Sequence, residues 1–181
     1  MSDDLRKRIL TDVKVELSDE FDQNFKRKAF FNQPWQKRMR DYRRGELMAV
    51  TQRLRRSFRG STGRSSIQFR SDAPYASLHN NGGKIKITPR MRAYFWAMYY
   101  KHAGAVTKTK GGKVSNSQRN AMLSGEAQFY KNMALTKQDA FVIPQRRIIG
   151  DHPKVRAIVD SVANRAVKEY AEKTLLPILK K

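Results

Sequence analysis

The sequence predicts an α+β fold in which a small antiparallel β-sheet packs with a long N-terminal helix and a C-terminal helix, and a loop or arm protrudes. Three observations predict it. Apolar residues recur every four positions near the N-terminus, a second apolar stripe lies near the C-terminus, and short alternating segments separated by glycine lie between them. With 181 residues, the chain is expected to form one domain, residues 1–181, with a core of its own.

The first helix is predicted from a stripe of apolar residues at every fourth position: Leu5, Ile9, Val13, Leu17, Phe21 and Phe25. Ser2 suits the N-cap, and Asp3 and Asp4 suit the first turn because carboxylates stabilise the positive end of the helix dipole. The helix is expected to end before Pro34, where Trp35 offers a large anchor for the following loop.

A second helix is predicted over residues 45–54, where four residues share one face: Leu47, Val50, Thr51 and Leu54. Residues 54–59 and 65–70 then alternate in character and predict an arginine-rich hairpin whose turn contains Gly60 and Gly63. A single helical turn is predicted in "APYASLHNNGG", ending at a glycine, Gly82 or Gly83, in the left-handed conformation. His79, Gly82 and Gly83 are therefore expected to have a structural role in this turn.

Residues 84–88 alternate as a strand that Pro89 stops, and the apolar "PRMRAYFWAMYYKH" predicts a helix. The preferred interpretation packs this helix under the sheet, with Phe95 and Trp96 in the core. The alternative makes interface anchors of three tyrosines, a residue type enriched at binding hot spots: Tyr94, Tyr99 and Tyr100.

The last third of the chain predicts a loop, two helices and a strand. Residues 104–117 are basic, rich in glycine and without periodicity, so a mobile loop is expected. A helix is expected over residues 116–133, and "AFVIPQRRIIG" is an edge strand or extended arm because Pro144 interrupts it. The C-terminal helix is expected to start with Asp151 as its cap and to kink or end at Pro177.

The formal net charge of +22 predicts attraction to polyanions or acidic proteins. The charge is uneven: residues 1–25 hold four basic and seven acidic residues, net −3, whereas residues 26–70 hold fourteen and two, net +12. This asymmetry indicates surfaces made for different neighbours; the alternative is that the long basic side chains only keep the protein soluble.

Cellular location is constrained by what the sequence lacks. Without cysteine there is no disulfide framework, so a cytosolic origin is expected. The first residues do not resemble a signal peptide, and the longest apolar run, Ala93–Tyr100, is far below the ~20 residues that span a bilayer.

No catalytic or metal-binding pattern is found, so neither an enzyme nor a cofactor is expected. His79, His102 and His152 lie far apart and lack a zinc spacing. The "GSTGRSS" segment lacks the lysine of a phosphate-binding loop and is better explained as a hairpin turn. The carboxylates lie mostly in amphipathic helices and form no identifiable pair.

Three segments together resemble the phage virion morphogenesis or tail-completion family of tailed bacteriophages: "VTQRLRRSF" at 50–58, "PYASLHNNGG" at 74–83 and "FVIPQRRIIG" at 141–150. The likeness covers about residues 24–170. It departs at Gln52, where the family usually has glycine, at Asn81, where an aromatic residue is common, and at Arg147 and Ile148, where proline and phenylalanine are usual.

The resemblance implies a non-enzymatic α+β subunit of a six-fold or twelve-fold ring at the neck or tail end of a virion, joining tail to head and assembled in the host cytoplasm. Its expected partners are copies of itself and other neck, connector or tail-tube proteins. An arginine-rich surface is expected to line the lumen or face an acidic ring: Arg53, Arg55, Arg56, Arg59, Arg64 and Arg70. Against DNA these arginines would contact phosphates only.

The interface candidates are Arg146 and Arg147, together with the tyrosines named above. The competing class is a ribosome- or nucleoid-associated protein that binds nucleic acid through the same basic residues without forming a ring.

Overall fold

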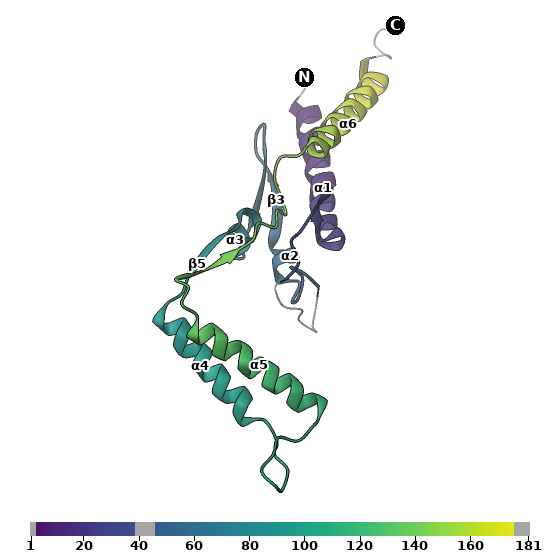
Figure 1. Ribbon diagram of the computed structural model, residues 1–181. Helices are drawn as coiled ribbons and strands as arrows, with labels where there is room; N and C mark the ends of the chain where they lie inside the picture. The colour runs from purple at the N-terminus through teal and green to yellow at the C-terminus, as the bar shows by residue number, and fades with distance from the viewer. Residues whose placement is uncertain (1–2, 39–45, 176–181) are drawn as a thin grey trace. The chain divides into compact units, whose positions relative to one another are not determined.

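The computed structural model describes residues 3–38 and 46–175, which divide into two compact units (Figure 1). Unit 1 comprises the described residues of 1–83 and 143–181, and unit 2 comprises residues 84–142. The α+β prediction is confirmed, but the strands form three separate two-stranded sheets rather than one: β1 with β2, β3 with β4 and β5 with β6.

Unit 1 is built on two long helices, α1 (Asp3–Arg27) and α6 (Pro153–Tyr170), which lie side by side. A π-helical turn, η1 (Ala171–Leu175), continues α6. Two short strands follow α1: β1 (Ala29–Phe30) and β2 (Gln33–Pro34). The remaining elements are α2 (Arg53–Ser57), β3 (Phe58–Thr62), β4 (Ile67–Ser71) and α3 (Ala76–Asn81).

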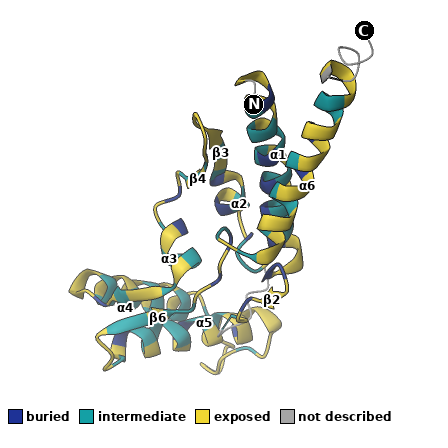
Figure 2. Cartoon of the chain, turned by 90° about the horizontal axis from the view of Figure 1, so that it is seen from above, coloured by how far each residue is buried: buried dark blue, intermediate teal, exposed yellow. Residues whose placement is uncertain are grey.

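The predicted stripe of α1 contributes to both hydrophobic clusters of unit 1. Leu5, Val13, Leu17, Phe21 and Phe25 are buried, and buried positions recur along α1 (Figure 2). Val13, Leu17 and Phe21 pack against a narrower stripe of α6 in which Val162 is fully buried. Two ion pairs, Arg8 with Glu169 and Arg165 with Glu16, join the exposed flanks of these helices.

The prediction of a helix over residues 45–54 is wrong for residues 46–52, the part before α2 that the structure describes. Glu46 and Ala49 instead pair across a tight turn, and α2 spans only Arg53–Ser57. The reason is a left-handed backbone at Met48 (φ 65°) and Gln52 (φ 58°), which an α-helix does not tolerate. The first hairpin strand consequently begins at Phe58 rather than Leu54.

The hairpin itself is confirmed, but its turn lies at residues 63–66, where the Gly63 N–H donates to the Ser66 carbonyl. Gly60 is part of β3. A side chain there would approach Lys14 Cγ to 2.9 Å and the Phe69 ring to 3.0 Å. Gly60 therefore serves the close packing of the hairpin against α1.

Replacing Gln52 with glycine is expected to raise the free energy of unfolding of unit 1 by about 1 kcal/mol, because a non-glycine residue pays roughly that cost in the left-handed region. Chemical denaturation measures it. The side chain of Gln52 donates to the Ala49 carbonyl over 3.0 Å, so Gln52→Ala serves as the control that removes this bond but keeps the strain. A stability of Gln52→Gly equal to or below that of Gln52→Ala would contradict the strain.

The predicted cap of the C-terminal helix is also corrected. His152, not Asp151, is the N-cap: its Nδ1 accepts from the Lys154 N–H at 3.2 Å. Its ring stacks on Phe31 at 4.4 Å, which holds the imidazole in place. Asp151 pairs with Arg156 instead. The proposed cap Ser2 and the proposed stop Pro177 lie outside the described residues.

Unit 2 contains a hairpin of two helices, α4 (Pro89–Gly104) and α5 (Gln118–Leu135). The strand before it, β5 (Gly83–Lys86), pairs with the strand after it, β6 (Ala140–Ile143). Thr88 caps α4 by accepting from the Met91 N–H, and Arg92 of α4 caps the end of α5 by donating to the carbonyls of Ala134 and Thr136.

The preferred interpretation of α4 is wrong. Phe95 and Trp96 do not form a core under a sheet, since α4 packs on α5 and no residue of α4 is buried. The reason is architectural, because a two-helix layer covers one side of each helix and leaves the other open.

The loop between α4 and α5 has an anchored base. The fully buried side chain of Asn120 accepts from the Thr107 N–H and donates to the carbonyls of Thr107 and Ser115. The residues beyond this base are mostly exposed, including three lysines: Lys108, Lys110 and Lys113. Mobility of this segment stays a prediction. Among the described helices, none has the length and apolar character needed to cross a membrane.

Candidate interaction surfaces

The β3–β4 hairpin carries arginines on one side only. Its register places Arg59 directly opposite Arg70 and Ser61 opposite Gln68, and all four side chains are exposed. The other side faces α1, where Phe69 meets Phe21 edge to face at 5.1 Å. We call this hairpin, with its outward side chains and the exposed Arg64 of its turn, the arginine ribbon.

Arg55 differs from the other predicted arginines. Its guanidinium donates two hydrogen bonds to the Asp22 carboxylate, so it ties α2 to α1. These bonds from Arg55 hold the pKa of the Asp22 carboxyl below its usual range. Five of the six predicted arginines remain exposed, and within the described residues none of the five pairs with a carboxylate: Arg53, Arg56, Arg59, Arg64 and Arg70.

A cluster of aromatic side chains lies along one edge of α4. Trp96 stacks on Tyr100 at 6.0 Å, and Tyr99 lies 5.7 Å from Trp96 and 5.1 Å from Tyr100. Tyr100 is 66% exposed. We call these three residues the aromatic edge. Tyr94 is also exposed, but its ring approaches Tyr130 of α5 instead.

Unit 1 has an apolar groove of about 550 Å³ between α1, the hairpin and the start of α6. Its walls are mainly aliphatic and aromatic, with Asp151 at the α6 end; the apolar lining includes Ile9, Val13, Phe69, Ile149 and Val155. Among the residues that the structure describes, no group of three His, Asp or Glu side chains is placed to hold a metal ion.

The predicted turn and the predicted arm contact each other inside unit 1. The Arg146 N–H donates to the His79 carbonyl at 2.8 Å. The Asn80 side chain accepts from the N–H groups of Ile148 and Ile149 at 2.8 and 3.0 Å. Gly82, at φ 72°, has no room for a side chain because the Gln145 nitrogen would lie 3.0 Å away. Gly82 ends α3 with a positive φ, as predicted, but its ψ of 178° lies outside the left-handed helical region.

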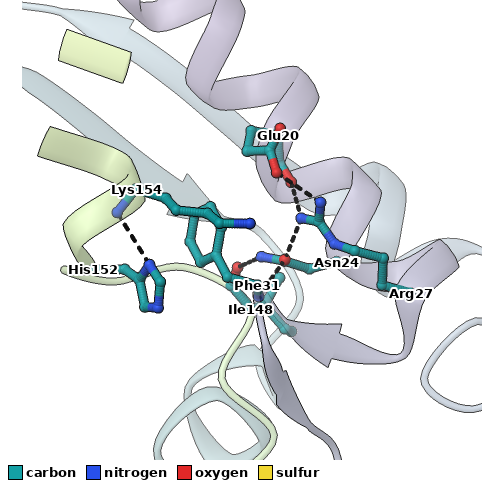
Figure 3. Close-up of polar contacts among 7 residues, drawn as sticks. All are labelled: Glu20, Asn24, Arg27, Phe31, Ile148, His152 and Lys154. Atoms are coloured by element: carbon teal, nitrogen blue, oxygen red, sulfur yellow. Dashed lines mark hydrogen bonds and ion pairs between the residues drawn. The ribbon is translucent and has the colours of Figure 1, made fainter. Parts of the chain in front are cut away.

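The other side of the same segment is held by residues near the end of α1. The Asn24 Nδ2 donates to the Ile148 carbonyl at 2.9 Å, and the Trp35 Nε1 donates to the Arg147 carbonyl at 2.7 Å. Asn24 also accepts from the Phe31 N–H and the Arg27 guanidinium (Figure 3). Residues 145–149 are therefore an internal strap, and the prediction that they form an arm is wrong for this part of the chain.

The two arginines of the strap have different environments. Arg146 is 8% exposed and donates to the carbonyls of Gln36 and Lys37, which favours a structural role over the predicted interface role. Arg147 is exposed, with its guanidinium 5.3 Å from the centre of the Phe30 ring. His79 lies beside Arg146; its Nδ1 is buried with no hydrogen-bond partner in the described chain, and burial lowers its pKa.

Asn24, Asn80 and Ile148 are the residues that sequence reasoning missed as organisers of this region. Asn24 lies one position before the last residue of the α1 stripe. A polar residue beside an apolar stripe is ordinarily exposed to solvent. That Asn24 is instead a buried hydrogen-bonding residue is apparent only from its three partners in the folded chain, Ile148, Arg27 and Phe31.

A family model, described as the phage virion morphogenesis family, matches residues 4–168. The chain belongs to this family. The match spans both units and includes every segment on which the resemblance rests. No curated protein and no solved structure matches significantly.

Membership in the phage virion morphogenesis family gives the chain a role in the assembly of a phage virion. The structure adds a reason for one family feature. Gln52, at the position where the family usually has glycine, is left-handed, which is the backbone conformation that glycine adopts without strain.

Proposed function

We propose that this protein is a non-enzymatic subunit of a ring at the neck or tail end of a tailed phage virion, which completes the tail and joins it to the head. The observation that carries the proposal is α4, a helix rich in aromatic residues that buries none of them within its own chain. Such a surface is typical of a subunit that is covered on assembly.

The occupant of the aromatic edge is a second copy of the chain. A ring closes through contacts between two different patches, so each subunit needs a protruding surface and a receiving one. Unit 2 offers the aromatic edge, and unit 1 offers the apolar groove, whose volume suits two or three aromatic side chains.

Charge supports the same pairing. Unit 2 holds eleven basic and two acidic residues, net +9, whereas residues 1–25, which supply one wall of the groove, have a net charge of −3. The positive charge of unit 2 and the negative charge of this one wall favour contact between copies in this head-to-tail sense, and the positive charge of unit 2 disfavours contact between two copies of it.

Electron microscopy of a phage lacking this gene tests the proposed place in the virion. Separate DNA-filled heads with unattached or overlong tails are expected. Intact joined virions would instead favour the alternative, a nucleic-acid-binding protein that forms no ring.

Replacing the half-buried Tyr99 and the exposed Tyr100 with alanine is expected to weaken association between subunits by about 2 kcal/mol or more while leaving the monomer folded, because aromatic anchors carry much of the energy of interfaces. Native mass spectrometry across a concentration series measures the association. Leu135→Ala, which removes another exposed apolar side chain of unit 2, is the control and should assemble normally. If the double variant folds and assembles like the control, the aromatic edge is not part of the interface.

A further inference from the structure

The arginine ribbon brings like charges together where the fold does not require it. Arg59 and Arg70 are direct partners across the strands, and like charges in such positions destabilise a hairpin. No carboxylate among the described residues pairs with either side chain; Arg70 donates only to the neutral Gln68 side chain at 2.8 Å. The pair is therefore poised to be neutralised by an anion from outside the chain.

The other outward side chains indicate which kind of anion. Ser61 and Gln68 complete the face, and the turn adds Arg64, all exposed. Arginine, serine and glutamine are among the side chains that contact phosphate and sugar oxygens. The centre of a protein–protein interface, by contrast, is rich in aromatic and apolar residues, and the outward side of this ribbon has none.

The same face disfavours a single strand as the ligand. Proteins that bind single-stranded nucleic acid stack the bases on aromatic side chains. In the ribbon, the aromatic residues Phe58 and Phe69 are on the side that faces the core of unit 1, opposite the arginines. A two-stranded ribbon also has the width that a groove of duplex DNA admits.

We infer that the arginine ribbon binds the sugar–phosphate backbone of double-stranded DNA, without reading its sequence, through Arg59, Arg70 and Arg64. Arg55 has no part in this binding because Asp22 already neutralises it. The inference goes beyond the proposed junction role and does not depend on ring formation.

The test measures the affinity of the full chain for a random-sequence DNA duplex by fluorescence anisotropy, over a series of salt concentrations. A +22 chain binds DNA to some extent wherever its charges lie, so the comparison is between two variants of equal charge. One is Arg59→Gln with Arg70→Gln, and the control is Lys108→Gln with Lys110→Gln in the exposed loop of unit 2.

The ribbon variant is expected to lower the magnitude of the slope of log K against log salt by about 2, because each lost phosphate contact removes roughly 0.9 from it. The loop variant is expected to keep nearly the full slope. Arg59→Lys with Arg70→Lys, which keeps both charges, should also keep the slope. The glutamine variant removes a repulsion, so its melting temperature should not fall.

Equal slopes for the ribbon and loop variants would overturn the inference, since the affinity for DNA would then depend only on the net charge of the chain. It would also be overturned if the ribbon variant bound DNA normally but lost affinity for poly-L-glutamate, which would identify an acidic protein surface as the ligand.

Discussion

Replacing Ile148 with alanine is expected to lower the free energy of unfolding of unit 1 by about 3–4 kcal/mol, because deleting buried methyl groups loses both their burial and the packing around the resulting cavity. Ile148 is completely buried and lies in the cluster formed by Phe25, Trp35 and Leu54. Urea denaturation followed by Trp35 fluorescence measures the change. Trp96 is the other tryptophan, so a Trp96→Phe background restricts the signal to unit 1.

The control for Ile148 is Val15→Ala, which shortens another β-branched side chain of unit 1 that is 50% exposed. It should change stability by no more than about 0.5 kcal/mol. If residues 145–149 were an arm that reaches a neighbouring subunit, Ile148→Ala would leave the isolated chain as stable as Val15→Ala does and would impair only assembly.

The second large effect is expected at Asn24. Changing it to leucine should destabilise unit 1 by about 3 kcal/mol, because the Phe31 N–H and the Ile148 carbonyl lose their partners and each unsatisfied buried group costs roughly 1–3 kcal/mol. The Arg27 guanidinium would keep its hydrogen bonds to Glu20, so losing its bond to Asn24 adds little to the destabilisation. The same fluorescence measurement applies.

The control is Asn164→Leu, the same substitution at an exposed position of α6, and it should leave the free energy of unfolding nearly unchanged. Equal stabilities of the two leucine variants would show that the Asn24 side chain is not the link between α1 and the strap. An Asn24 effect without an Ile148 effect would place the link in the turn at Phe31 rather than in the strap.

Local patterns predicted the long elements well. The stripe of α1, the helices α4 and α5 and the arginine hairpin follow from the spacing of apolar residues and from glycine in the sequence. The predictions failed where the backbone departs from its usual conformations. Nothing in the residue types of Met48 or Gln52 signals a positive φ, and these two residues convert the predicted helix into a turn.

The candidate surfaces were only partly predictable, because exposure depends on partners distant in the sequence. Arg55 and Arg56 are adjacent, yet the first is paired with Asp22, thirty-three positions away, and the second is exposed. Similarly, "FVIPQRRIIG" reads as an exposed arm until Asn24, Trp35 and Asn80 supply hydrogen bonds to its backbone. Those partners come from three separate segments, so no local pattern contains them.

The pairing of β5 with β6 has a consequence for how this gene can vary. The chain leaves unit 1 at Gly83 and returns at Ile143 through strands that are hydrogen-bonded neighbours. Topologically, the α4–α5 hairpin is thus an insertion into a connection that a short turn would close. Changes in its length or surface would therefore leave the strap and the α1–α6 pair of unit 1 with the same connections along the chain.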